Sequence, residues 1–175
     1  MFFAEAENIA ENFFAVNTLI LDVMDGKQAL DVVDKCGFNV VALTANSNVE
    51  LLEKQAREFR PKLVAVFDEK AAKGLSIALS DTDITVLSGI EGVLEVASIE
   101  CDIVLNAVTG IAGLRPTIAA IEAGNDVALA NKETVVMAWP LIKKLANSKN
   151  AKIIPVDSEH SAIFNLINQI KTENI

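Results

Sequence analysis

The stretch VVALTANSNVELLEKQAREFRPKLVAVF, residues 40–67, decides the fold class of this chain. A short apolar run leads through a polar turn into a segment with apolar residues at three- and four-residue spacing, and a second apolar run follows. Asn48 is a good helix cap and Pro61 a helix terminator. The pattern predicts a strand, a helix and a second strand, and a crossover of this length makes the two strands parallel.

The same alternation continues along most of the chain. Strands are expected at residues 19–24, 40–44, 63–67, 84–87, 103–108, 127–130 and 153–156, and helices at residues 28–35, 49–59, 70–79, 116–123 and 134–146. The sequence therefore predicts an α/β fold that is Rossmann-like and doubly wound, with a mainly parallel sheet of about seven strands and helices on both faces.

Composition and charge exclude several classes of protein. A formal net charge of −9 repels nucleic acid and anionic membranes, so a phosphate-bearing ligand needs a local attraction. No apolar run approaches the ~20 residues that cross a bilayer. The first 16 residues carry three Glu and no Lys or Arg, unlike targeting segments. We expect a cytoplasmic location and no nucleic-acid or membrane partner.

The loops that follow the strands are where an open parallel sheet binds its ligands. The first loop, residues 22–27, has one glycine, Gly26, and two acids that repel phosphate, so an ordinary capped helix start is the favoured interpretation. The loop at residues 44–48 has no acid before Glu50, where NAD enzymes place one for the ribose. It therefore suits NADP better than NAD, and a helix cap with a polar turn explains it equally well.

Two further loops carry charged residues. Asn131 and Glu133 suit the start of a helix, whereas Lys132 opposes the helix dipole and is easier to explain if it meets an anionic substrate or cofactor. An exposed lysine that extends into solvent is the alternative. Asp157 and Glu159 share one face of an extended chain and can hold Mg²⁺ or Mn²⁺ in an open shell. A solvated acidic turn is the other interpretation of that pair.

These segments together resemble 1-deoxy-D-xylulose 5-phosphate reductoisomerase over roughly residues 28–164. The matching segments are ALDVV at 29–33, VVAL at 40–43, QAREFRP at 55–61, NAVTGIAGL at 106–114, LANKE at 129–133 and PVDSEHSAIF at 155–164. The resemblance implies an NADPH-dependent and divalent-metal-dependent enzyme that rearranges and reduces its sugar phosphate to 2-C-methyl-D-erythritol 4-phosphate, for isoprenoid precursor biosynthesis. It also implies a homodimer.

The resemblance assigns roles to matching positions. Lys132 and Glu159 would be catalytic and would contact substrate together with Ser158, and Asp157 and Glu159 would bind Mg²⁺ or Mn²⁺. The residues expected to contact NADPH are Asn46, Ser47, Asn48, Gly110, Asn131 and Glu133.

The chain departs from the family pattern at two places. The glycine-rich turn G-S-T-G-S-I-G of the family corresponds to ILDVMDG at residues 20–26, which keeps only Gly26, and the similarity fades after Phe164. We therefore expect an atypical N-terminal extension at 1–17, an NADPH-binding domain at 18–150 and the truncated start of a catalytic domain at 151–175. The alternative is a degenerate or repurposed Rossmann-like binding module without catalytic activity.

Overall fold

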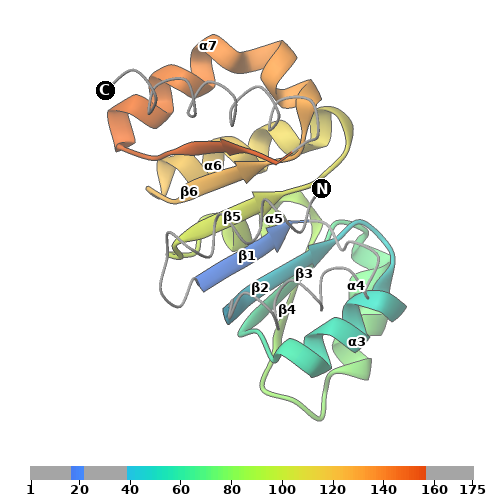
Figure 1. The fold of residues 1–175 in the computed structure, drawn as a ribbon. Helices are drawn as coiled ribbons and strands as arrows, with labels where there is room; N and C mark the ends of the chain where they lie inside the picture. The colour runs from blue at the N-terminus through green and yellow to red at the C-terminus, as the bar shows by residue number, and fades with distance from the viewer. Residues whose placement is uncertain (1–16, 22–38, 157–175) are drawn as a thin grey trace.

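A computed structural model describes residues 17–21 and 39–156, and all structural statements concern these residues. They contain seven strands: β1 (Asn17–Leu21), β2 (Asn39–Ala45), β3 (Leu63–Val66), β4 (Thr85–Ser88), β5 (Ile103–Asn106), β6 (Asp126–Leu129) and β7 (Ile153–Pro155). The strands pair in the order β4-β3-β2-β1-β5-β6-β7, and every pairing is parallel (Figure 1). The predicted α/β chain with a parallel sheet is confirmed.

The helices connect successive strands. They are α3 (Val49–Phe59), α4 (Glu69–Ala78), α5 (Gly89–Ala97), the short 3₁₀ helix η1 (Gly110–Gly113), α6 (Leu114–Glu122) and α7 (Lys132–Lys149). Helix α3 has the predicted bounds, and the Asn48 side chain caps it by accepting from the Leu51 backbone N–H at 3.2 Å. The helix expected at residues 28–35 lies outside the described residues.

Helix α5 was missed by the sequence pattern because two glycines interrupt its apolar residues. Gly92 has a packing reason: a Cβ at this position would lie 2.8 Å from the Leu87 Cβ of β4. The glycine therefore lets the helix approach the neighbouring strand closely. Val93 and Val96 then place one face of α5 in the core.

The core divides into clusters on opposite faces of the sheet. On β3, Val64 and Val66 pack with Leu52 of α3 and Leu75 of α4, whereas Ala65 between them packs with residues of α5. Because alternate side chains of a strand point to opposite faces, α3 and α4 cover one face and α5 covers the other. Figure 1 shows α3 and α4 beside the β2–β4 half of the sheet, and α6 and α7 beside the β5–β7 half.

Helix α7 is kinked near its middle. Ala138 has non-helical backbone angles, φ −135° and ψ 15°, two residues before Pro140. Proline has no N–H to donate to the preceding turn, and its ring crowds that turn, which explains the kink. Beyond it Ile142 and Ala146 are buried. None of the helices described has the length and apolar character needed to cross a membrane.

The strand order determines where a ligand is expected. β1 lies between β2 and β5, so the chain builds the sheet outward in one direction through β4 and then resumes on the other side of β1. A crevice opens at such a switch point, beyond the carboxyl ends of the strands. The loops that follow β2 and β5 border that position.

Candidate functional site

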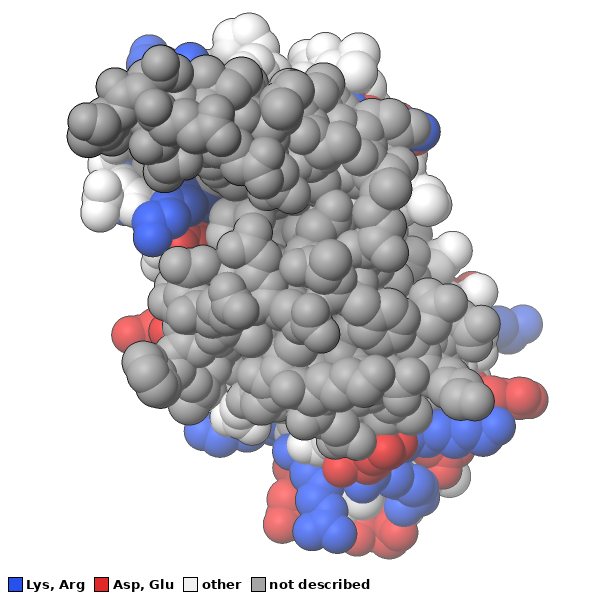
Figure 2. Space-filling model, in the orientation of Figure 1, with Lys and Arg blue, Asp and Glu red and all other residues white. Residues whose placement is uncertain are grey.

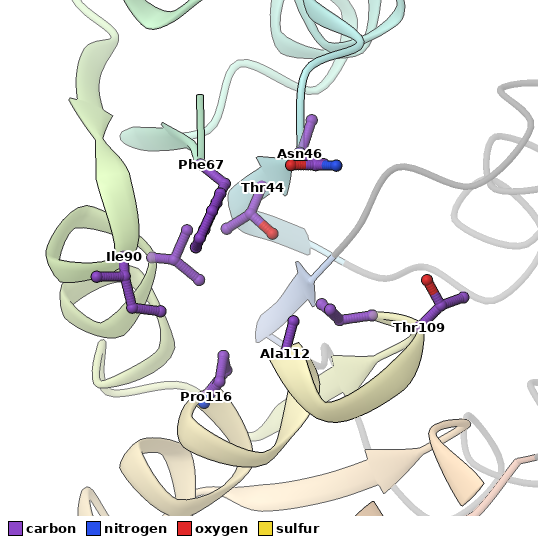
Figure 3. A pocket seen from close by; sticks show the side chains of 10 residues that line it. Thr44, Asn46, Phe67, Ile90, Thr109, Ala112 and Pro116 are labelled. Carbon is purple, nitrogen blue, oxygen red and sulfur yellow. The ribbon is translucent and has the colours of Figure 1, made fainter. Parts of the chain in front are cut away.

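A cavity of about 290 Å³ lies at the carboxyl edge of the sheet, at the switch point. Its walls come from the ends of β2 and β3, from α5, from the segment between β5 and α6, and from the first turn of α6 (Figure 3). The lining residues are Thr44, Ala45, Asn46, Phe67, Ile90, Val93, Val108, Thr109, Ala112 and Pro116. This volume is near the lower end of the range, roughly 300–1,000 Å³, typical of small-molecule sites.

The lining of this cavity is neutral. Its polar side chains are those of Thr44, Asn46 and Thr109, and none of the lining residues that the structure describes is acidic or basic. The described walls therefore offer an apolar surface with a few neutral hydrogen-bonding groups.

Phe67 provides an apolar surface at this site. Its side chain is 48% exposed, and Figure 3 shows it beside Ile90, with Thr109 across the cavity. An exposed aromatic ring offers a flat surface to a planar ligand ring. The sequence pattern placed Phe67 inside a strand, but β3 ends at Val66. Its position directly after a parallel strand was the signal that could have identified it.

Asn106, at the end of β5, holds the segment that forms one wall. Its Nδ2 donates to the Gly113 carbonyl at 2.9 Å and to Thr117 Oγ1 at 2.6 Å, and its Oδ1 accepts from the Val108 N–H at 3.1 Å. Thr117 Oγ1 also donates to the Gly113 carbonyl at 2.9 Å. Asn106 and Thr117 are fully buried, so the wall is fixed from inside the core.

Asn131, the cap of α7, holds the same wall from the other side. Its Oδ1 accepts from the Thr134 N–H at 2.6 Å, and its Nδ2 donates to the carbonyls of Val108 and Gly110, the latter at 2.8 Å. Gly113 packs directly on this amide, because a Cβ there would lie 2.5 Å from Asn131 Nδ2. The loops after β5 and β6 are therefore joined into one unit.

The cofactor residues predicted after β2 have different surroundings. Asn46 lines the cavity, and Figure 3 shows its side chain above that of Thr44. Ser47 is exposed. Asn48 uses its side-chain oxygen to cap α3, as the competing sequence interpretation proposed. The structure thus brings only Asn46 of these three into the cavity wall.

The residues predicted around η1 and the start of α7 lie on the adjoining loops. Gly110 has φ 71°, and its carbonyl oxygen accepts a hydrogen bond from Asn131 Nδ2. Lys132 and Glu133 are exposed in the first turn of α7. The hydroxyl of Thr134 is buried and has no hydrogen-bond partner among the described residues. Asn131 is 2% exposed, and neither it nor Gly110 lines the cavity.

Two parts of the predicted site lie outside the described residues. They are the loop at residues 22–27 and the segment with Asp157, Ser158 and Glu159. Within residues 17–21 and 39–156, no group of three His, Cys, Asp or Glu side chains could hold a metal ion. The assignments of metal and substrate contacts therefore stay predictions.

Solved structures resemble this fold. The 1-deoxy-D-xylulose 5-phosphate reductoisomerase from Zymomonas mobilis, in complex with NADPH, matches with a TM-score of 0.81 and 33% identity, over 87% of this chain and 41% of that chain. A DOX-P reductoisomerase in complex with magnesium matches with a TM-score of 0.79 and 37% identity, over 84% of this chain and 38% of that one.

Sequence comparison gives the same family. Curated 1-deoxy-D-xylulose 5-phosphate reductoisomerases from Agathobacter rectalis and Chlorobaculum tepidum are 52% and 47% identical over 153 residues, which cover 83% and 86% of this chain. The chain spans about 40% of the length of these relatives. Residues 25–139 match the family model for the same enzyme. The chain belongs to the 1-deoxy-D-xylulose 5-phosphate reductoisomerase family.

Proposed function

We propose that this chain is the NADPH-binding portion of a 1-deoxy-D-xylulose 5-phosphate reductoisomerase. The whole enzyme would convert that sugar phosphate to 2-C-methyl-D-erythritol 4-phosphate. The observation that carries the proposal is the cavity at the switch point between β2 and β5, because this is where a Rossmann-like sheet binds a dinucleotide, and the lining residues among those described are uncharged. The complex of the Zymomonas mobilis relative with NADPH supports the assignment.

NADPH would extend across the carboxyl edge from β2 towards α7. The loop with Asn46, Ser47 and Asn48 would accept the 2′-phosphate, because its side chains are neutral and supply hydrogen-bond donors. Phe67 would contact the adenine ring. Gly110, Asn131 and Glu133 would lie towards the nicotinamide, where the loops after β5 and β6 meet.

The chemistry would take place beyond the start of α7. Bound NADPH would supply the hydride, and a divalent ion would polarise the substrate's carbonyl and hydroxyl oxygens. Lys132 would bind the substrate from the first turn of α7, and Asp157, Ser158 and Glu159 would hold Mg²⁺ or Mn²⁺ and the substrate. The DOX-P reductoisomerase in complex with NADPH, fosmidomycin and magnesium supports this combination of ligands.

The proposal also covers the organisation of the whole protein. We assign residues 18–150 to a doubly wound, Rossmann-like domain and residues 1–17 to an N-terminal extension, whose last residue, Asn17, begins β1. We propose that the catalytic domain starts within residues 151–175, and β7 of this segment pairs with β6 at the edge of the sheet. The complete enzyme would act as a homodimer.

A second candidate function is a binding module without catalysis. The sequence at residues 20–26 favours it, because this segment keeps one glycine and adds Asp22 and Asp25 where phosphate would approach. Under this alternative, NADPH would cause no amide shifts at the cavity wall and would not be preferred over NADH.

Titration of the 175-residue chain with NADPH and with NADH, followed by amide NMR, tests the proposal. We expect shifts at residues of the cavity wall, weak affinity and a preference for NADPH. Asn46→Asp should weaken NADPH binding roughly fivefold, because two like charges about 4 Å apart in water cost ~1 kcal/mol, and should affect NADH less. Asn147→Asp on the exposed face of α7 is the matched control. Absence of shifts at the cavity with either dinucleotide would rule out the proposal for this chain.

A further inference from the structure

We propose that Thr134 is a positioning residue for Asp157: its buried hydroxyl donates to the carboxylate of this expected metal ligand and holds it beside the start of α7. The inference rests on the proposed function, in which Asp157 binds Mg²⁺ or Mn²⁺, and deepens it by naming the residue that orients that ligand. Asp157 lies outside the described residues, and the residues that carry the inference belong to α7, β6 and β7.

The hydroxyl of Thr134 is a buried polar group that lacks a partner among the described residues. Thr134 is 0% exposed, and its Oγ1 makes no hydrogen bond within residues 17–21 and 39–156. A threonine in a helix can donate to the carbonyl four residues earlier, which here belongs to Ala130, but this bond is not formed. Because buried polar side chains are nearly always paired, a partner is expected outside the described residues.

Thr134 lies on the side of α7 that faces the sheet. The buried residues of this helix follow one another at four-residue spacing, and they are Thr134, Ala138, Ile142 and Ala146. The last three belong to the same core cluster as Leu129 of β6. Thr134 is therefore the first residue of this buried stripe, at the carboxyl edge of the sheet, where β6 leads into α7.

Strand β7 leads the chain to the same place. Ile153 packs with the core cluster of α7, whereas Ile154 and Val156 belong to the cluster on the other face of the sheet. Because alternate residues of a strand point to opposite faces, an extended chain would point residue 157 to the α7 face. The Val156 N–H donates to the Leu129 carbonyl at 3.2 Å, so the chain is still paired with β6 one residue before Asp157. Asp157 is therefore expected at the same edge and on the same face as Thr134.

The first turn of α7 suits a carboxylate. The amino end of a helix carries a partial positive charge, and Lys132 is exposed in the same turn. The hydroxyl of Thr134 has one proton to donate, and an ionised carboxylate can only accept. A hydrogen bond of this kind orients a carboxylate that binds a metal ion, and metal affinity depends on it.

Thr134→Val tests this bond, because valine has nearly the shape of threonine without the hydroxyl. In the unmodified chain, we expect it to lower the urea midpoint of unfolding, because the Asp157 carboxylate loses a donor. In an Asp157→Ala background we expect the opposite sign, because valine then removes a buried hydroxyl that has no partner. Thr85→Val, exposed on the edge strand β4, is the matched control, and its effect should be the same in both backgrounds.

Mn²⁺ binding, followed by the paramagnetic broadening of amide NMR signals, is the second measurement. Thr134→Val should weaken Mn²⁺ binding roughly tenfold, as the loss of a partner behind a metal ligand typically does. Thr134→Ser keeps the hydroxyl and should retain most of the affinity, and Thr85→Val should leave it unchanged. An affinity that Thr134→Val does not alter would overturn the proposal.

The unfolding midpoints also separate this proposal from a purely structural role of Thr134. A loss of the same size with and without the Asp157 carboxylate, or no change in either background, would overturn it. If Thr134→Val does not fold, Thr134→Ser and Thr134→Ala, which differ only in the hydroxyl, replace it in the same comparison. If the unmodified chain binds no Mn²⁺, the proposed metal function fails for this chain, while the midpoints still decide whether Thr134 holds Asp157.

Discussion

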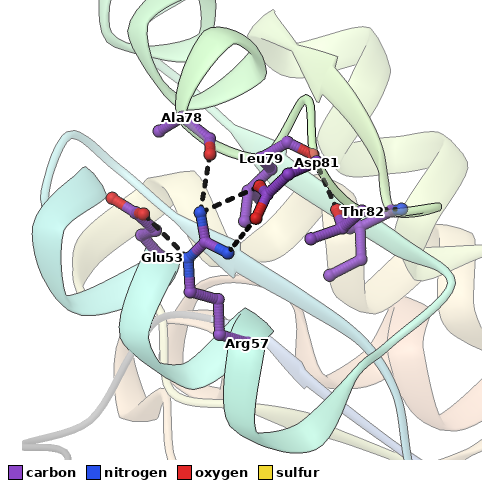
Figure 4. A network of polar contacts seen from close by, with 7 residues as sticks. Glu53, Arg57, Ala78, Leu79, Asp81 and Thr82 are labelled. Atoms are coloured by element: carbon purple, nitrogen blue, oxygen red, sulfur yellow. Dashed lines mark hydrogen bonds and ion pairs between the residues drawn. The ribbon is translucent and has the colours of Figure 1, made fainter.

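The two edges of the sheet carry polar networks of opposite character. At the carboxyl edge, buried neutral amides hold the cavity wall. At the amino edge, Arg57 of α3 donates from Nε to Glu53 at 2.9 Å, from its terminal nitrogens to Asp81 at 2.9 and 3.0 Å, and to the Ala78 carbonyl at 2.7 Å (Figure 4). Arg57 and Asp81 are exposed, and Figure 2 shows basic and acidic side chains interspersed over this end of the molecule.

The two hollows differ in size and in the charge of their described lining residues. The hollow at the amino edge, about 490 Å³, is larger than the cavity at the carboxyl edge. Its lining includes Arg57, Arg60, Lys62, Asp81 and Asp83. These charges are of both signs and belong to an exposed surface, where an ion pair contributes little because water and salt screen it. The network at the carboxyl edge is uncharged, but its side chains are buried. The loss of one of its hydrogen bonds therefore leaves a buried polar group without a partner, which is costly.

Of the substitutions that test this contrast between the two edges, removal of the Asn106 side chain should lower the stability of the fold the most. Asn106→Ala deletes the partner of the Val108 N–H and one donor to the Gly113 carbonyl, inside a fully buried site. A buried group without its partner costs about 1–3 kcal/mol, so we expect a loss of roughly 2–4 kcal/mol in the free energy of unfolding. Urea unfolding followed by circular dichroism measures it.

Asn147→Ala provides the control for that change. Asn147 is exposed on α7, and substitutions at such positions change stability by at most about 0.5 kcal/mol. A similar loss for the two variants would show that burial of the Asn106 amide is not what makes the carboxyl edge sensitive.

Gly113→Ala should have an intermediate effect. The new Cβ would lie 2.5 Å from Asn131 Nδ2 and 3.1 Å from the Val108 carbonyl oxygen, so the amide and the loop must move apart. Overpacking of this kind costs roughly 1–3 kcal/mol. The same urea titration measures the loss, and amide NMR should show the change centred on residues 108–113.

Gly74→Ala is the matched control for Gly113→Ala. Gly74 lies within α4, where a Cβ would meet nothing within 4 Å. Alanine favours a helix over glycine by about 0.8–1.0 kcal/mol, so this variant should be slightly more stable than the unmodified chain. No loss of stability in Gly113→Ala would contradict the close contact of Gly113 with Asn131, and a loss in Gly74→Ala would show that an added Cβ is unfavourable even without such a contact.

The sequence predicted the strands better than the site. Apolar runs such as Leu63–Val66 are recognisable as strands from the sequence, because buried parallel strands consist of continuous apolar residues. Helix α5 was not predicted, because Gly89 and Gly92 are typical of loops. The structure explains Gly92 by its close contact with Leu87. Local pattern contains no information about such a contact between elements.

The sequence located the loops of the candidate site, but it did not reveal which partners their side chains bind. The loops after β2, β5 and β6 follow from the rule that ligands bind at strand ends. The rule pointed to the loop at residues 44–48, and the family resemblance then implied Asn46, which lines the cavity. Asn131 was predicted as a helix cap, which its bond with the Thr134 N–H confirms. Its bonds to the loop after β5, and those of Asn106, could not be predicted, because their partners Val108, Gly110 and Gly113 are defined only when two loops meet in three dimensions.

The smallest effect is expected at the amino edge, from Asp81→Asn. Hydrogen bonds from Arg57 lower the pKa of Asp81 below its ordinary value of 3.8, and they raise the pKa of Arg57. A lowered carboxyl pKa stabilises the fold above pH 3.8 and loses this effect as the pH falls through the folded-state value. The difference in unfolding midpoint between the unmodified chain and Asp81→Asn should therefore be small and constant from pH 5 to 8, and it should vanish in acid. High salt should reduce this difference at neutral pH.

Asp83→Asn, in the same hollow, makes no ion pair with a described residue and is the control. A pH-independent difference, or one as large as that of Asn106→Ala, would mean that the exposed network holds the fold as firmly as the buried one, and the contrast between the two edges would then be wrong.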